Sequence, residues 1–148
     1  MSTQVLRTLF ARDLKKLKLE IELYQHEANL WKVDKKIANS GGNLCLHLVG
    51  NLNTYFGTIL GNTGYVRDRD AEFSTRGVPQ KELIQKIEAV ILVVDSVLSN
   101  LTEAQLKAEY PMLVFAEKTS TEFFLMHLAM HLSYHLGQVN YHRRLLDY

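Results

Sequence analysis

The sequence has a single cysteine and no excess of charge of either sign. Each of these two features argues against a class of protein. The single cysteine, Cys45, cannot form an internal disulfide, and its apolar neighbours in NLCLHL suit a small buried side chain rather than a reactive thiol. We therefore expect a reducing, cytoplasmic location. Seventeen basic side chains against sixteen acidic ones leave a formal net charge of +1. This balance creates no strong field toward phosphate backbones or anionic lipid, so no nucleic-acid partner is expected.

Long hydrophobic runs and flexible linkers are also lacking. No apolar run approaches the roughly twenty residues that cross a bilayer, and charges enter the N-terminal stretch MSTQVLRTLFARDLKKLK too early for a signal peptide. We expect a soluble protein with no membrane contact. The two prolines belong to no Pro/Gly/Ser-rich linker, and no internal repeat divides the chain. With 148 residues, 47% of them hydrophobic, residues 1–148 are expected to form a single domain.

Helical periodicity is the strongest pattern in the sequence. Apolar residues recur at three- and four-residue steps in four stretches, which predicts helices over residues 3–31, 43–60, 79–101 and 119–148. Pro79 suits the first position of the third helix, and Thr119 with Glu122 matches a capping box that starts the fourth. These features predict an all-α fold, a four-helix bundle, in which sites are built from side chains pointing between helices.

Two long connections separate the later helices. Residues 61–79 are rich in glycine and charge and show no sustained period, so we expect a long, partly ordered loop between the second and third helices. Residues 102–118 connect the third helix to the fourth, with room for a short strand or hairpin around residues 112–115. The shape of any pocket depends on these two connections.

Three histidines lie four residues apart in HLAMHLSYHLGQ, at positions 127, 131 and 135. At about 100° per residue, His131 and His135 lie near the apolar face of the fourth helix, whereas His127 lies further from it. Residues one turn apart are close enough for two imidazoles to bind one ion. A third nitrogen must come from another helix, and His47 is the only histidine of the second helix. It lies at the edge of that helix's apolar stripe, on a polar line with Asn51.

The alternative interpretation is that these histidines are hydrogen-bonded side chains of a packing helix, with no metal at all. Of the other two histidines, His26 lies in polar company and is expected to be exposed, and His142 is expected at the frayed end of the last helix. Neither HLAMH nor HLSYH carries the glutamate of the H-E-x-x-H metalloprotease helix. No Glu-x-x-His pair occurs either, which argues against a di-iron carboxylate bundle.

With these residues assembled, the chain resembles the DinB/YfiT-like superfamily of bacterial metal-binding four-helix bundles. The resemblance covers most of the chain and rests on NSGGNLCLHLVGNL at residues 39–52, RDRDAEF at 67–73 and HLAMHLSYHLGQV at 127–139. The superfamily pattern pairs a histidine early in the second helix with H-x-x-x-H-x-G-Q in the fourth. The resemblance thus implies that His47, His131 and His135 are metal ligands, that Gly137 and Gln138 complete the motif, and that His127 is a neighbour of the site.

The resemblance also implies a chemistry. Three neutral imidazoles leave the charge of a divalent cation uncompensated and a coordination position free, which suits zinc, with nickel, iron or manganese as alternatives. Such a centre activates a thiol or a water near neutral pH. The resemblance implies a transferase that uses a low-molecular-weight thiol to attack a small electrophilic substrate. The alternatives are a metal-dependent hydrolase and a non-catalytic helical dimer with a structural metal.

Other residues have less specific assignments. The charges of RDRDAEF are typical of a solvated or salt-bridged loop, but the same loop could cover the site, with Arg69 and Glu72 as the residues to test for substrate binding. Asn51 could hydrogen-bond a ligand across the site or pack locally. A homodimer is expected, with the apolar ILVV segment of the third helix as a candidate face.

Overall fold

The computed structural model describes residues 2–148, which form six α-helices, one 3₁₀ segment and one π-helical segment. In chain order these elements are α1 (Thr3–Glu22), η1 (Glu27–Trp31), α2 (Gly41–Leu52), η2 (Asn53–Leu60), α3 (Arg69–Ser74), α4 (Gln80–Asn100), α5 (Glu103–Lys107) and α6 (Thr121–Leu146). Within residues 2–148 no strand forms, so the predicted all-helical class is confirmed. Over the same residues, no helix is both long and apolar enough to cross a membrane.

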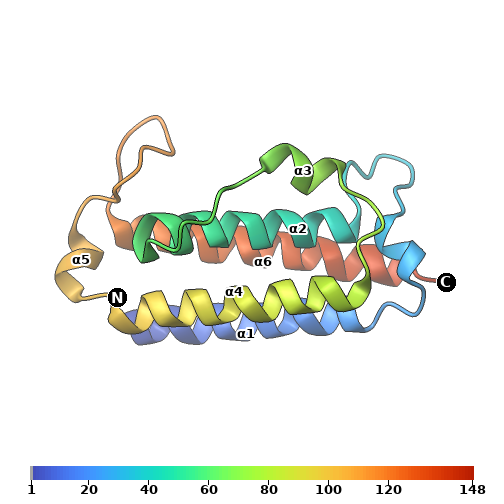
Figure 1. The fold of residues 1–148 in the computed structure, drawn as a ribbon, viewed down its shortest axis with the longest axis horizontal. Coiled ribbons are helices and arrows are strands. Elements are labelled where there is room, and N and C mark those ends of the chain that lie inside the picture. Colours follow the sequence, from blue (N-terminus) through green and yellow to red (C-terminus); the bar gives the residue numbers. More distant parts are fainter. Residues whose placement is uncertain (1) are drawn as a thin grey trace.

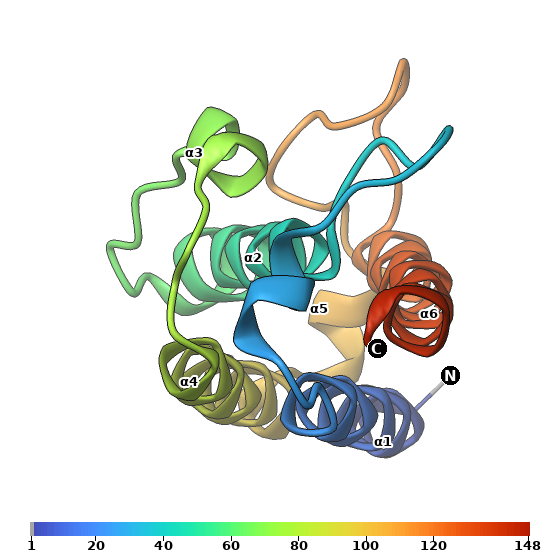
Figure 2. The same ribbon diagram turned by 90° about the vertical axis from the view of Figure 1, so that its right-hand side faces the viewer.

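The long helices run side by side as a bundle. Figure 1 shows α1, α2, α4 and α6 aligned along the long axis of the molecule, and α1 and α2 each pack against both α4 and α6. The end-on view in Figure 2 places α3, the loop before α2 and the loop before α6 on one side of the bundle. They stand over α2 and α6, away from α1 and α4, and so surround the surface between these two helices.

The core lies where the apolar stripes of the long helices meet. Leu6, Phe10, Leu14, Leu17 and Ile21 of α1 are at most 1% exposed, as their three- and four-residue spacing predicts. Each of the other long helices contributes a similar row, and Cys45 is fully buried among these side chains. Burial raises the pKa of the Cys45 thiol to about 12, which agrees with the expected unreactive cysteine.

The first helix is shorter than the predicted range of residues 3–31. It ends at Glu22, and the following residues turn back as the separate segment η1. Gln80 stabilises this end, because its side-chain amide donates hydrogen bonds to the carbonyls of Ile21, at 2.7 Å, and Tyr24, at 3.1 Å. The Ile21 carbonyl also accepts from the Tyr24 N–H, at 3.4 Å, so Gln80 adds to a long backbone hydrogen bond at the end of the helix. A residue far away in the sequence therefore stabilises the end of α1, and the local pattern could not indicate it.

The second and third helices agree closely with their predicted ranges. Helical backbone runs from Gly41 to Leu60, with Ser40 as N-cap, but the last part, η2, is π-helical rather than α-helical. The third predicted helix is α4, for which Pro79 is the N-cap residue rather than the first helical position.

Both long connections contain a helix that periodicity did not predict. In residues 61–79 the short helix α3 begins after Asp68, whose carboxylate accepts a hydrogen bond from the Ala71 N–H at 3.0 Å. In residues 102–118 the helix α5 begins with a capping box formed by Thr102 and Gln105. Helices this short show less than two turns of periodicity, so only their caps identify them.

The start of α6 also differs from the prediction. Its N-cap is Ser120, whose hydroxyl accepts a hydrogen bond from the Phe123 N–H at 3.2 Å, rather than Thr119. Residues 112–115, where the sequence left room for a short strand or hairpin, form no strand. In the described part of the chain, the only bridge is an isolated antiparallel pair between Glu109 and Ser120.

Candidate metal centre

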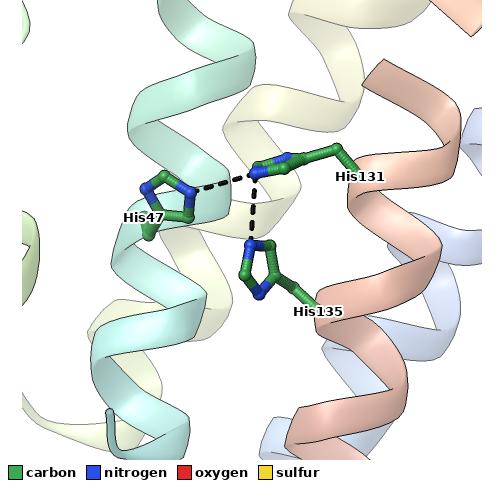
Figure 3. A group of neighbouring side chains, drawn as sticks. All are labelled: His47, His131 and His135. Atoms are coloured by element: carbon green, nitrogen blue, oxygen red, sulfur yellow. Dashed lines mark hydrogen bonds between the residues drawn. The ribbon is translucent and has the colours of Figure 1, made fainter. Parts of the chain in front are cut away.

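Two neighbouring helices bring the three predicted histidines together. His47 lies in the middle of α2, and His131 and His135 lie one turn apart on α6. Because α2 packs directly against α6, the three imidazoles meet between the helices, as Figure 3 shows. Each offers a ring nitrogen, and these three nitrogens lie within 4.8 Å of one another. The cluster could hold a metal ion.

Two of the three distances between the ring nitrogens match the spacing of metal ligands. His131 Nε2 lies 3.1 Å from His47 Nε2 and 3.2 Å from His135 Nε2 (Figure 3). Nitrogens bound to zinc at about 2.0–2.1 Å in a tetrahedral site are separated by about 3.3 Å. The rings meet edge to face rather than stacked, since the planes of His131 and His135 are 83° apart. Their lone pairs can therefore converge on one point.

The protons available in the cluster do not satisfy all of these contacts. His47 donates its Nδ1–H to Glu72 Oε1 at 3.0 Å, and His135 donates its Nδ1–H to Gln138 Oε1 at 2.6 Å, because both oxygens only accept. A ring that carries its single proton at Nδ1 has a lone pair at Nε2. His131 has at most one Nε2–H for two neighbours, so one contact lacks a hydrogen bond. A cation between the three nitrogens would satisfy every one of them.

Burial favours the neutral, ligating form of His131 and His135. Burial, together with the neighbouring His135 and His47, lowers the pKa of His131 from 6.5 to about 3. Burial also lowers the pKa of His135, although the hydrogen bond to Gln138 opposes this shift. A ring that stays unprotonated at neutral pH keeps a lone pair for a metal. His131 Nδ1 is buried and has no hydrogen-bond partner in residues 2–148.

Glu72 lies between His47 and Arg67 and binds both side chains. Its carboxylate is 6% exposed and accepts from His47 with Oε1, while Arg67 donates to both of its oxygens at 2.9 Å in a bidentate pair. Burial alone would raise the pKa of Glu72, but the hydrogen bonds from His47 and Arg67 outweigh burial and lower it. The carboxylate is thus held ionised against the imidazole, the arrangement that orients histidine ligands in many metal sites.

The helix α3 holds Glu72 at this position. Asn43 of α2 donates from its side-chain amide to the backbone carbonyls of Glu72, at 2.9 Å, and Thr75, at 2.8 Å. Gly50 allows the close approach, because a Cβ atom there would lie 2.6 Å from Glu72 Cδ and even closer to Oε2. The Phe73 ring lies against His47, with 4.8 Å between the ring centroids. The short helix therefore covers one side of the cluster.

The remaining predicted residues lie around the cluster in different ways. His127, one turn before His131, is exposed and contacts the Phe115 ring, with centroids 4.8 Å apart. Asn51 is 6% exposed, and its Oδ1 has no partner within residues 2–148.

Arg69 is exposed and lies over the Phe73 ring, 5.3 Å from its centroid. It forms no hydrogen bond or ion pair with Glu72, whose side chain is bound by His47 and Arg67 instead.

Two expectations about the other histidines have different outcomes. His26 is exposed, as expected. His142 is not at a frayed end, because it is 3% exposed and both ring nitrogens are hydrogen-bonded. Tyr24 donates its hydroxyl to His142 Nδ1 at 2.7 Å, and His142 donates its Nε2–H to the Lys32 carbonyl at 2.8 Å. The chain before α2 packs over the end of α6 and buries this ring.

Sequence reasoning did not single out Arg67 among the charges of RDRDAEF. The run alternates basic and acidic side chains, so the pattern alone does not show which arginine pairs with Glu72. The available signal was Asp68, a good N-cap residue, which places Arg69 in the first turn of a helix and Arg67 before it.

A family model described as "Protein of unknown function (DUF1572)" matches residues 4–147. The comparison with curated proteins finds no match.

Proposed function

The chain belongs to the DUF1572 family of proteins of unknown function, and from its three-histidine cluster we propose that it is a divalent-metal-binding enzyme. The ligands in this proposal are His47, His131 and His135. The observation that carries it is the meeting of three Nε2 atoms, two of them 3.1 and 3.2 Å from the third, with too few protons to bridge them. A packing helix has no physical reason to bring lone pairs together in this way.

The proposal includes membership of the DinB/YfiT-like superfamily of four-helix metal-binding bundles. Its support is the combination of an all-helical bundle with His47 on α2 and H-x-x-x-H-x-G-Q on α6. In this motif Gln138 has a physical task, since its Oε1 accepts from His135 Nδ1–H and leaves His135 Nε2 free to ligate.

A divalent ion at this position would act as a Lewis acid that makes a thiol or a water nucleophilic near neutral pH. The chain's own residues prepare the site for it. Glu72 holds the proton of His47 at Nδ1, and Arg67 compensates the charge of Glu72. Phe73 covers the His47 ring and keeps water from one of its faces.

The substrate chemistry that we propose is attack by a low-molecular-weight thiol on a small electrophile, and hydrolysis is the same reaction class with water as nucleophile. An open coordination position favours an enzyme over a structural metal site. Within residues 2–148 the cluster contains three ligating side chains and no fourth, and Cys45 is buried in the core, away from it. Structural zinc sites are usually closed by four protein ligands. Zinc suits the ligand set, and nickel, iron and manganese are the alternatives.

Metal analysis tests the proposal. We expect protein purified without an affinity tag to contain close to one equivalent of zinc or nickel, and the His47→Ala and His131→Ala variants to lose it. His26→Ala is the matched control, because His26 is exposed and lies outside the cluster. A parent protein that binds none of the four metals after they are supplied would contradict the proposal.

Activity is tested after metal binding is established. The metal-loaded protein is incubated with candidate thiols and an electrophile, and consumption of the electrophile is measured against the His131→Ala variant. Turnover with a thiol supports the transferase, and turnover with water alone supports the hydrolase. No turnover in either assay would favour the structural role of the metal.

A further inference from the structure

A cavity of about 400 Å³ lies between the loop before α2, α2 and the C-terminal half of α6, and its lining includes neighbours of the three-histidine cluster but none of the three histidines. Gln138 lines this cavity, and the same side chain accepts the hydrogen bond from His135. Leu44, which also lines it, precedes His47 by one turn of α2. The cavity therefore reaches within one turn of a proposed ligand on both helices.

Most of the lining is apolar. The volume lies within the range of about 300–1,000 Å³ that is usual for small-molecule pockets, which combine apolar walls with a few polar groups. Here the apolar walls come from the loop before α2, from α2 and from α6, namely Ile37, Ala38, Leu44, Tyr141 and Leu145. An apolar molecular body fits such walls better than a polar one.

The charge of the lining has one sign. Among the lining residues within the described part of the chain, Lys36 is the ionised side chain, and none is acidic. The His142 ring is neutral, because its Nδ1 accepts from Tyr24 and its Nε2–H donates to the Lys32 carbonyl. Lys36 itself makes no hydrogen bond or ion pair within residues 2–148, so its ammonium group is available to a ligand. Asn39 and Gln138 add amide groups.

We propose that this cavity binds the substrate and that the substrate is a small molecule with an apolar body and an anionic group that pairs with Lys36. The assignment as substrate pocket rests on the proposed function. The ligand class rests on the cavity alone. Binding here would place the molecule next to Gln138, one side chain away from His135.

Octanoate is a suitable probe, and 1-octanol is its uncharged counterpart. Binding is measured by calorimetry on the full chain after removal of metal with a chelator, so that the carboxylate has no ion to bind. We expect octanoate to bind more tightly than octanol. The Lys36→Gln variant should weaken octanoate binding about fivefold and leave octanol unchanged. Lys35→Gln is the matched control, since Lys35 is adjacent and exposed but does not line the cavity.

Ala38→Trp tests the cavity itself, because a large side chain on this exposed residue would fill it. We expect the variant to keep the helical circular dichroism of the parent and to bind neither probe. Absence of octanoate binding to the parent, or equal binding by parent and Ala38→Trp, would overturn the proposal. If Lys36→Gln and Lys35→Gln change octanoate affinity equally, the proposed pairing of an anionic group with Lys36 is wrong.

Failure of the metal site and failure of the pocket give different results. If the parent binds octanoate as expected but takes up no metal, the proposed function fails and the ligand class of the cavity holds. If the parent takes up metal but does not bind octanoate, the pocket assignment fails alone.

Discussion

At the scale of single residues, the cluster depends on where each imidazole carries its proton. Glu72 and Gln138 each accept from an Nδ1–H, which leaves the Nε2 atoms of His47 and His135 directed at His131. An imidazole with the opposite tautomer would present an N–H to the ion and could not bind it.

Replacement of Glu72 should therefore weaken metal binding without removing a ligand. In Glu72→Gln a neutral amide replaces the carboxylate beside His47, and we expect metal affinity to fall about tenfold. The affinity is measured by competition with a chromophoric chelator. Arg69→Gln is the control, because Arg69 is exposed and contacts Phe73 rather than Glu72. A larger loss of metal affinity in Arg69→Gln than in Glu72→Gln would contradict the role of Glu72 in orienting His47.

His142 gives the fold a dependence on pH that is separate from the cluster. Burial lowers its pKa from 6.5, a shift that the bond to the Lys32 carbonyl and the charge of Asp147 oppose and the charge of Lys32 assists. The unfolded chain therefore binds more protons below about pH 6.5, so stability is complete above this pH and is lost as the pH falls. The slope from one such histidine is at most about 1.4 kcal/mol per pH unit.

The test is thermal unfolding of the metal-free parent and the His142→Gln variant between about pH 7.5 and about pH 5.5. We expect the parent to lose more stability over this interval than the variant. His131 and His135 also have lowered pKa values, but they are present in both proteins and cancel in the comparison. The same loss in both proteins would show that His142 does not contribute.

At the scale of elements, the short helix α3 positions the carboxylate on which His47 depends. It is held by its Asp68 cap, by the two hydrogen bonds from Asn43 and by direct contact with Gly50 of α2. The long helices supply the ligands, and this six-residue helix fixes the orientation of one of them.

Gly50→Ala tests this role of α3. The added Cβ would collide with the Glu72 carboxylate, so the carboxylate must move away from His47. We expect metal affinity to fall about tenfold while the helical circular dichroism is kept. Gly137→Ala is the matched control, because a Cβ at Gly137 of α6 would meet no atom within 4 Å. That change should raise stability by up to about 1 kcal/mol through helix propensity and leave metal affinity unchanged. Unchanged affinity in both variants would contradict the role of α3.

Element prediction succeeded where periodicity is long and failed where an element is short or its end is stabilised by a distant residue. The rows of α1, α4 and α6 extend over five turns or more, so their stripes are easily recognised. Gln80 stabilises the end of α1, and α3 and α5 are too short to show a period. Of the cluster, the sequence could indicate His131 and His135 by their spacing, whereas Arg67 could be chosen over Arg69 only after α3 was known.

At the scale of the whole molecule, α6 is apolar on two sides. Its inner face is buried in the core, while another set of large side chains on the same helix, outside the cavity described above, is 46–71% exposed, namely Phe123, Met126, Met130 and Tyr134. A helix that is apolar all round is usually covered on both sides. On α4, the helix predicted as a dimer face, Val90 and Val94 are buried, and Leu92 is 72% exposed.

We therefore predict that the homodimer forms through α6 rather than through α4. Size-exclusion chromatography with light scattering should give twice the 17.0 kDa of one chain. Met130→Lys should shift the mass to that of a single chain, because a charge in the centre of the interface would have to be buried. Leu92→Lys is the matched control and should leave the dimer intact. A parent mass of a single chain would contradict the prediction.

The sequence by itself determined the helical class, the burial of Cys45 and the presence of histidines on inward faces of two helices. These properties follow from side-chain periodicity and composition, which are local. Only the tertiary structure decided that His47 meets His131 and His135, that Glu72 rather than Arg69 contacts the cluster, and that His142 is buried. Each of these depends on how helices distant in sequence pack together, and no local pattern encodes the distance between two side chains on different helices.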